Sequence, residues 1–342
     1  MAGELGRYAA ANARVRALLA SLLGRSGLET LYGYPTVEAL LDALARTPYA
    51  TSGGAALVSE RGLLHRLAAV GRAVLGTLAD PERTFLRQHL LRHEVGNLKT
   101  VIRAVHRRLA WEDIASYLVP LPGIATVDPV KLLTARDMRE LADLLDGSLY
   151  GPALRAAISA VERAGPFAAE IAIELAYYER LWAAADSLEA ADAAHARALL
   201  GIVFDVLNLS WIARYRDALG LSPEETLNYT LRQGRWITTD IRRDLAENPR
   251  TPWAVTLART PYGALLAEAE ARGFDAASAR LWRFLARQIQ RVLASYPFHI
   301  GVPLGFLLAQ EIEIRDLRVL LAAKSLGLPP AEALDRLATV RH

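Results

Sequence analysis

Leu-Ala-Arg-Thr-Pro-Tyr occurs at Leu44–Tyr49 and again at Leu257–Tyr262. A second motif follows each copy, beginning Glu94-Val-Gly-Asn-Leu after the first and Glu313-Ile-Arg-Asp-Leu after the second. Between them lies a weaker pair of the same kind, which begins with Leu-Tyr-Gly and continues with Asp-Val-Leu-Asn-Leu. The residues shared by the copies form a repeat signature: Tyr49, Tyr150 and Tyr262; Glu94, Asp205 and Glu313; and Asn97, Asn208 and Asp316.

The repeat predicts three related helical units, residues 1–110, 111–220 and 221–342. Each copy must bury an equivalent face against its neighbours, so an internal repeat indicates the fold more firmly than any local motif does. No low-complexity linker separates the units, and we expect them to pack as one continuous body. The second copy lacks Thr-Pro before its tyrosine and has Asp in place of Glu, so we do not expect identical chemistry at the three positions.

Composition and periodicity both predict an all-α protein. Hydrophobic residues make up 52% of the chain and aromatic residues 7%, and the abundant Ala and Leu are strong helix formers. Residues 98–109 place apolar side chains at the spacing of one buried helix face, and no segment alternates with the period of a strand. The expected buried positions of the three copies are Leu98, Val101, Ile102, Val105 and Leu109; Leu209, Ile212 and Ala213; and Leu317, Leu320 and Leu321.

Helix ends are marked by Gly220–Glu225 and Gly327–Glu332. In each segment a glycine, which suits the end of one helix, is followed by a proline, which suits the start of the next.

Basic residues occupy the side of each repeat helix opposite the apolar stripe. One interpretation is a solvated charged face, since exposed charges contribute little to folding. The other is that three equivalent basic faces line one shared surface that binds partner proteins. The candidate contacts are Lys99, Arg103, Arg214, Arg315 and Arg318. We expect reversal of Arg315 and Arg318 to Glu to weaken assembly more than stability.

The charge balance argues against nucleic acid as a partner. The chain has 40 basic and 37 acidic residues, a net charge of +3, and no run of five or six like charges. Absence of cysteine excludes disulfides and thiolate metal sites. The longest uncharged stretch, residues 292–310, is interrupted by prolines and glycines, so we expect no transmembrane segment. That stretch is either a surface for an apolar partner or a bent core segment leading into the third repeat helix.

Catalytic motifs are missing from the sequence. There is no Gly-x-x-x-x-Gly-Lys-Ser/Thr loop, no Gly-x-Ser-x-Gly elbow and no His-Glu-x-x-His. His89 and His93 share a helix face and could hold a metal ion, but we interpret them as ordinary helix-surface histidines. The sequence therefore predicts a chain without cofactor, metal or enzymatic activity of its own.

Four segments together resemble the family of C subunits of V/A-type ATPases, the counterparts of the d subunit in eukaryotic vacuolar ATPases. They are Tyr8–Leu23, Ala45–Tyr49, Glu94–Arg103 and Glu311–Leu320. The resemblance implies a funnel-like all-α body of three similar subdomains with pseudo-three-fold symmetry. It also implies a non-catalytic central-stalk subunit, one copy per complex, on the cytoplasmic side of the membrane. Its partners would be the shaft of the soluble ATPase sector and the membrane proteolipid ring, between which it transmits torque.

An unrelated helical-repeat scaffold that binds protein partners is the alternative. Its units would stack as an open solenoid without closing around an axis.

Overall fold

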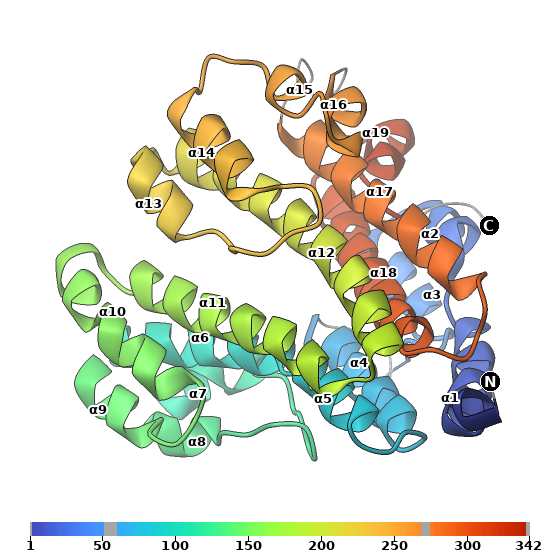
Figure 1. Cartoon of the computed structure of the whole chain (residues 1–342), viewed down its shortest axis with the longest axis horizontal. Coiled ribbons are helices and arrows are strands. Elements are labelled where there is room, and N and C mark those ends of the chain that lie inside the picture. The colour runs from blue at the N-terminus through green and yellow to red at the C-terminus, as the bar shows by residue number, and fades with distance from the viewer. Residues whose placement is uncertain (1, 51–59, 268–273, 340–342) are drawn as a thin grey trace. The chain divides into compact units, whose positions relative to one another are not determined.

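The structure is a computed structural model that describes residues 2–50, 60–267 and 274–339. This part of the chain consists of helices and turns and contains no strand, which confirms the all-α prediction. The chain forms two compact units, which are identified in Figure 1 by residue number and colour. Unit 1 combines Met1–Leu63 with Ala190–His342, and unit 2 is Leu64–Glu189. The three-unit division at residues 110 and 220 stays a prediction.

Unit 1 contains both ends of the chain. Its long helices are α1 (Ala2–Leu19), α12 (Ala190–Ala213), α17 (Phe274–Leu293) and α18 (Gly301–Ser325). Its shorter helices are α2 (Gly24–Tyr32), α3 (Val37–Leu44), η4 (Arg214–Ala218), α13 (Pro223–Asn228), α14 (Thr239–Glu247), α15 (Trp253–Thr256), α16 (Pro261–Leu266) and α19 (Pro330–Asp335).

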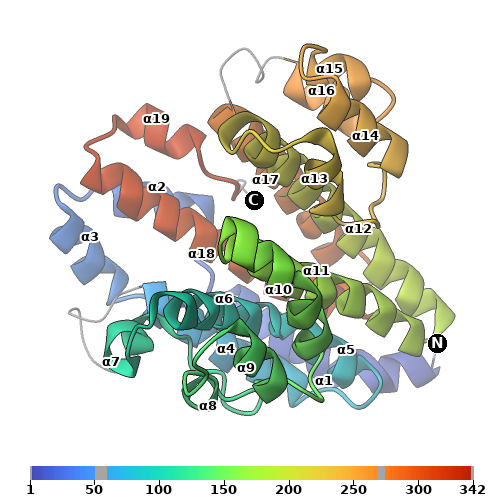
Figure 2. The ribbon, with the colours of Figure 1, turned by 90° about the vertical axis from the view of Figure 1, so that its left-hand side faces the viewer.

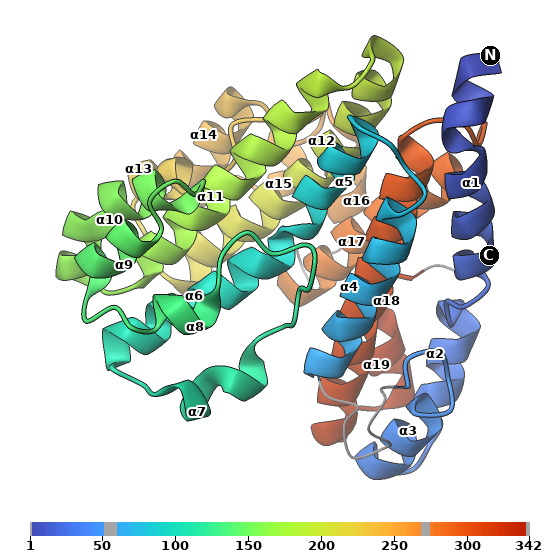
Figure 3. The same cartoon turned by 90° about the horizontal axis from the view of Figure 1, so that it is seen from below.

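The core of unit 1 forms where α12, α17 and α18 pack on one another. Phe204 of α12, Leu285 of α17 and Phe306 of α18 are buried there. The N-terminal helix α1 packs against α18, as Figure 3 shows from below. Most residues of α12 and α18 are buried, as in a helix that its neighbours enclose.

Unit 2 is built from antiparallel helices on either side of α11 (Phe167–Ala184). Helices α5 (Glu82–Leu90) and α6 (Arg92–Arg107) pack against α11, and so does α10 (Tyr150–Ala164). The remaining helices are α4 (Glu60–Leu75, from residue 64 onward in unit 2), α7 (Trp111–Ile114), η2 (Ala115–Tyr117), α8 (Pro129–Leu132), α9 (Met138–Leu144) and η3 (Ala185–Ser187).

The expected buried helix faces are largely confirmed. The predicted side chains that are less than a tenth exposed are Leu98, Val101, Ile102, Val105, Leu209, Ile212, Ala213, Leu317 and Leu320. Two predictions are wrong. Leu109 is 40% exposed because α6 ends at Arg107, and Leu321 is only half-buried.

Helix ends fall where glycine and proline predict them. Gly220 and Gly327 adopt the left-handed conformation, with φ of 63° and 65°. Ser222 caps α13 by accepting a hydrogen bond from Glu225 N–H, and the Glu225 carboxylate accepts one from Ser222 N–H. Such a capping box satisfies two donors that a helix start would otherwise leave unpaired.

One helix of the described residues, Ala190–Ala218, is long and apolar enough to cross a membrane. Of its most apolar window, 78% is buried inside the structure, so the helix serves as a core element. The uncharged stretch 292–310 ends α17, turns, and begins α18, with Ile300 and Leu304 fully buried. From His299 onward the stretch is largely buried and leads into α18, as the core-segment interpretation predicts, whereas Ala294, Ser295 and Tyr296 in the turn are exposed.

Candidate functional site

The repeat-signature tyrosines each donate a hydrogen bond to a repeat-signature carboxylate. Tyr49 Oη lies 2.6 Å from Glu313 Oε1 in unit 1. Tyr150 Oη lies 3.0 Å from Glu94 Oε1 in unit 2, and in unit 1 Tyr262 Oη lies 3.1 Å from Asp205 Oδ2. All six side chains are buried. The repeat therefore marks three internal tyrosine–carboxylate contacts, here called junctions. The sequence did not predict that all three copies would form the same hydrogen bond.

Each junction carboxylate also accepts backbone hydrogen bonds from a distant loop. Asp205 accepts from the amides of Arg235, Trp236 and Ile237 at 3.0, 2.9 and 3.1 Å. In the corresponding places, Glu94 accepts from Thr126 and Val127, and Glu313 accepts from Leu23 and Gly24 at 2.9 and 2.8 Å. A buried carboxylate is tolerated when several donors replace its hydration, and these donors fix the loops to the repeat helices.

The polar residue three positions after each carboxylate holds a second loop. The Asn97 amide exchanges two hydrogen bonds of 2.8 Å with the backbone of Val119. Asn208 does the same with Leu231, at 3.0 and 2.8 Å. Asp316, which has no donor in its side chain, accepts instead from Ala338 N–H at 3.0 Å. The signature residues are thus structural contacts in all three copies.

A hydroxyl two residues before each tyrosine completes the motif. Thr47 Oγ1 donates to the Leu44 carbonyl at 2.6 Å and accepts from Tyr49 N–H at 3.1 Å. Thr260 makes the same pair of bonds. Ser148 makes them in the second copy, where the hexapeptide itself is missing. The sequence reading missed Ser148, although the spacing Leu-x-x-Ser/Thr-x-Tyr is shared by all three copies.

Burial perturbs the ionisation of the junction groups. Desolvation raises the pKa of Asp205 and Glu313, and in Asp205 this outweighs the opposing effect of three amide donors. Burial first, and the adjacent carboxylate second, raise the pKa of Tyr150 and Tyr262. Each phenol therefore stays protonated and donates a hydrogen bond to the carboxylate.

Two candidate partner-binding residues form a charged ladder inside unit 2. Arg103 of α6 makes a two-bond contact with Glu170 of α11, at 2.6 and 2.5 Å. Lys99, one turn earlier on α6, pairs with Glu174, one turn later on α11. Because Lys99 and Arg103 already have internal partners, the simple picture of a free solvated basic face does not describe α6.

The other three candidates differ from one another in exposure. Arg315 is an internal contact: its guanidinium lies 2.9 Å from the fully buried Asp316 and over the Trp282 ring at 5.4 Å. The expectation that Arg315 is an exposed charge is therefore wrong. Arg318 and Arg214 are exposed, and the Arg214 side chain forms no ion pair with any other described residue.

A fourth tyrosine–carboxylate contact attaches α1 to the start of α12. Tyr8 Oη donates to Asp192 Oδ2 at 2.6 Å, and Asp192 also accepts from Ile300 N–H at 2.9 Å and lies 3.6 Å from Arg7. Beside this contact the rings of His195 and His299 stack at 4.0 Å. Nδ1 of His299 accepts from Gly301 N–H at 3.0 Å, in the first turn of α18.

This arrangement predicts acid sensitivity in unit 1. Burial, followed by His195, lowers the pKa of His299, so the folded state favours the neutral ring. The stabilising contribution of neutral His299 is therefore fully present above the unfolded pKa of about 6.5. Below that pH the free energy of unfolding decreases, by up to about 1.4 kcal/mol per pH unit for one proton. Asp192 partly opposes the change. Urea unfolding at pH 7.5 and 5.5 should show this loss, and His299→Asn, which retains an acceptor, should reduce it. An equal loss in the variant would contradict the assignment.

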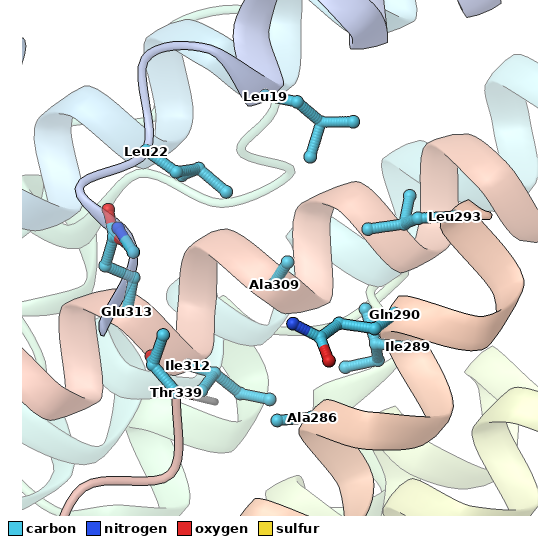
Figure 4. Close-up of a pocket in the computed structure, with 11 residues that line it drawn as sticks. Leu19, Leu22, Ala286, Ile289, Gln290, Leu293, Ala309, Ile312, Glu313 and Thr339 are labelled. Carbon is cyan, nitrogen blue, oxygen red and sulfur yellow. The ribbon is translucent and has the colours of Figure 1, made fainter. Parts of the chain in front are cut away.

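The described residues offer no metal site, and the cavity beside the Glu313 junction is small. No three His, Asp or Glu side chains there lie close enough together to hold a metal ion. His89 is 2% exposed, so its interpretation as a helix-surface residue is wrong. A small apolar cavity of ≈ 50 Å³ lies beside Glu313 in unit 1. Figure 4 shows Leu22, Gln290 and Ala309 lining it, and it has no room for a nucleotide.

These observations define a class of protein: an all-α repeat protein whose repeated polar residues serve internal junctions. The ATP synthase (C/AC39) subunit family matches residues 11–336. The C subunit of the A-type ATP synthase from Methanocaldococcus jannaschii is 26% identical over 96% of this chain and 86% of its own length. The corresponding protein of Methanothermobacter thermautotrophicus is 27% identical, over 98% and 89%, and that of Thermococcus kodakarensis 25%, over 94% and 88%.

The chain belongs to the ATP synthase (C/AC39) subunit family. It is a non-catalytic subunit, in agreement with the sequence reading. The alternative of an unrelated repeat scaffold is thereby excluded.

Proposed function

We propose that the chain is the socket of a rotary A-type ATP synthase, which couples the rotating central shaft of the soluble sector to the membrane proteolipid ring. It would lie on the cytoplasmic side of the membrane as a peripheral subunit, one copy per complex. Shaft, socket and ring would turn together, so that torque links ATP synthesis or hydrolysis to ion translocation. The proposal needs a stiff body that closes around an axis.

The Tyr49–Glu313 bond is the observation that carries the proposal. Tyr49 belongs to the first predicted unit and Glu313 to the last, yet they are joined at 2.6 Å within one compact unit. In an open solenoid the first and last repeats are the farthest apart. Pairing of the two ends therefore supports a closed arrangement, in which the chain between them returns to its start.

The other junctions follow the same cyclic order. Tyr150 bonds to the carboxylate of the unit before it, Glu94, and Tyr262 bonds to Asp205. If each structural module runs from a signature carboxylate to the next signature tyrosine, the chain has three equivalent modules. The third module would combine the C-terminal segment from Glu313 with the N-terminal segment up to Tyr49. This supports the pseudo-three-fold funnel expected from the family resemblance. The buried, multiply hydrogen-bonded junctions would also resist shear when torque is applied.

Co-purification tests the proposal. The full chain should bind purified central-shaft subunits and a detergent-solubilised proteolipid ring of the same ATP synthase, and a reconstituted complex lacking it should hydrolyse ATP without pumping ions. If the chain binds neither partner, the assignment fails.

Exposed arginines are suited to testing which side of the socket meets which partner. Because Arg315 is an internal contact, we propose Arg214 and Arg318 for charge reversal in binding experiments.

A further inference from the structure

Arg242 of α14 is a charged side chain that the fold encloses. Helices α13 and α14 pack on each other beside α12 (Figures 1 and 2), and Arg242 is only 3% exposed. Its guanidinium stays protonated at every pH at which proteins fold. Burying an ionised group is costly unless an opposite charge and hydrogen bonds replace its lost hydration. The enclosed guanidinium therefore requires a negative charge beside it.

The hydrogen-bond acceptors around Arg242 are all uncharged. Nη1 donates to Thr230 Oγ1 at 3.0 Å, and Nη2 donates to Thr239 Oγ1 at 2.8 Å. A second contact of Nη2, with the Arg232 carbonyl, is long at 3.5 Å. The buried Nε donates to no acceptor in the described part of the chain. One donor of the guanidinium is thus unsatisfied, and another is only partly satisfied.

The immediate surroundings of this guanidinium are positive. Burial, followed by the charge of Arg232, lowers the pKa of Arg242, and no carboxylate opposes the shift. Arg232 is itself exposed and forms no ion pair with any residue in the described ranges. Through its bond to Thr239, the first residue of α14, the guanidinium also lies beside the positive end of the helix dipole. These contacts raise the cost of burying Arg242.

The carboxylates of the adjoining segments already serve other contacts. They are Asp205 at its junction, Asp240 beside Arg243, Asp244 beside Thr256, and Glu225 in the capping box of α13. The remaining carboxylate, Glu224 of α13, is exposed and forms no ion pair with an arginine of the described chain. The negative charge that Arg242 requires is therefore not supplied by its own neighbours.

We propose that Arg242, Arg232 and Thr239 bind a small tetrahedral oxyanion of the class of inorganic phosphate. Nε and Nη2 of Arg242 donate paired hydrogen bonds to two of its oxygens, the geometry in which a guanidinium binds phosphate best. Arg232 supplies a second positive charge, and the Thr239 hydroxyl donates a further bond. Because Arg242 is almost completely enclosed, only a small ion reaches it, past the exposed Arg232 and Thr239.

A bound oxyanion would stabilise the loop that completes the Asp205 junction. Arg242 contacts Thr230 and Arg232 at the start of this loop and Thr239 at its end. The amides of residues 235–237, between these points, donate to the Asp205 carboxylate. Neutralising the guanidinium would therefore strengthen the hold of the loop on α14 and of the junction on the loop. The inference needs no partner subunit and is independent of the socket function.

Titration of the full chain with sodium phosphate tests the site, with sodium chloride of equal ionic strength as the reference. Calorimetry should detect phosphate binding, and the melting temperature should rise by about 1 to 3 °C near saturation. Arg242→Gln should lower the affinity for phosphate about tenfold or more and remove the rise. Arg232→Gln alters only an exposed side chain and should weaken binding several-fold, so it decides the matter if Arg242→Gln does not fold.

Arg243→Gln is the matched control, since it removes the next arginine of α14, which is exposed and paired with Asp240. Phosphate binding should be unchanged in this variant. Phosphate also stabilises proteins in general by exclusion from their surface, and that effect acts on every variant alike. If the unaltered chain binds phosphate no better than chloride, or if folded Arg242→Gln or Arg232→Gln binds it as tightly as the unaltered chain does, the site is refuted.

Discussion

Replacing Asp205 by Ala should lower the free energy of unfolding by about 3 to 5 kcal/mol, enough to unfold much of the population at moderate temperature. The carboxylate is fully buried, and its removal leaves the amides of Arg235, Trp236 and Ile237 without their acceptor, together with the hydroxyl of Tyr262. The unpaired donors account for most of the loss, because burying an N–H or O–H group without an acceptor costs free energy that no other contact offsets.

The loss can be measured by urea denaturation, with three companions that divide it into parts. Tyr262→Phe removes one donor and should cost about 1 kcal/mol. Asp205→Asn keeps the shape but turns an N–H group toward amide donors, so we expect an intermediate loss. Asp143→Ala removes an exposed carboxylate of α9 and should change stability by less than about 0.5 kcal/mol. If Asp205→Ala costs no more than Asp143→Ala, the junction is not a structural contact.

Sequence periodicity sufficed to predict the helices and their buried faces because both depend on local spacing. The face that begins at Leu98 is buried as far as the end of α6 and no further, since the apolar pattern continues at Leu109 after the helix has stopped. Helix α6 ends in a left-handed turn at Arg108. Arginine disfavours that backbone conformation, so the sequence gives no signal that the helix ends there. Caps at Gly220 and Gly327 were predicted correctly because glycine marks them directly.

The signature residues were found in the sequence, but their connections were not. Tyr49 and Glu313 are 264 positions apart, and no local rule pairs them. The sequence comparison relied on the hexapeptide, which the second copy lacks, and so did not align Ser148 with Thr47 and Thr260. The contact itself requires only a hydroxyl three residues after Leu and two residues before Tyr. Arg315 was misjudged because helix periodicity ranks it with exposed residues, while its neighbour Asp316 and the Trp282 ring hold it.

Gly263→Ala should cost about 3 kcal/mol, the upper end of the usual cost of overpacking. A Cβ at this position would lie 2.7 Å from the Leu257 carbonyl oxygen and 2.9 Å from Ala258 Cα. Both are backbone atoms, so no side-chain rotation relieves the contact, and the first turn of α16 must move away from α15. That turn carries Tyr262, so the bond to Asp205 should lengthen or break as well.

Two other glycines serve as matched comparisons for Gly263. A Cβ added at Gly151, next to Tyr150, would meet the Leu145 carbonyl oxygen at the same 2.7 Å, so Gly151→Ala should behave alike in unit 2. Gly96 lies within α6 and has nothing within 4 Å of the place that a methyl group would take, so Gly96→Ala should stabilise by about 0.5 to 1 kcal/mol. The remaining copy has Ala50 after its tyrosine, outside any helix, and needs no glycine there. Thermal unfolding of the three variants decides the matter: if Gly263→Ala and Gly96→Ala shift the midpoint in the same direction, close packing beneath the repeat tyrosines is not what requires glycine.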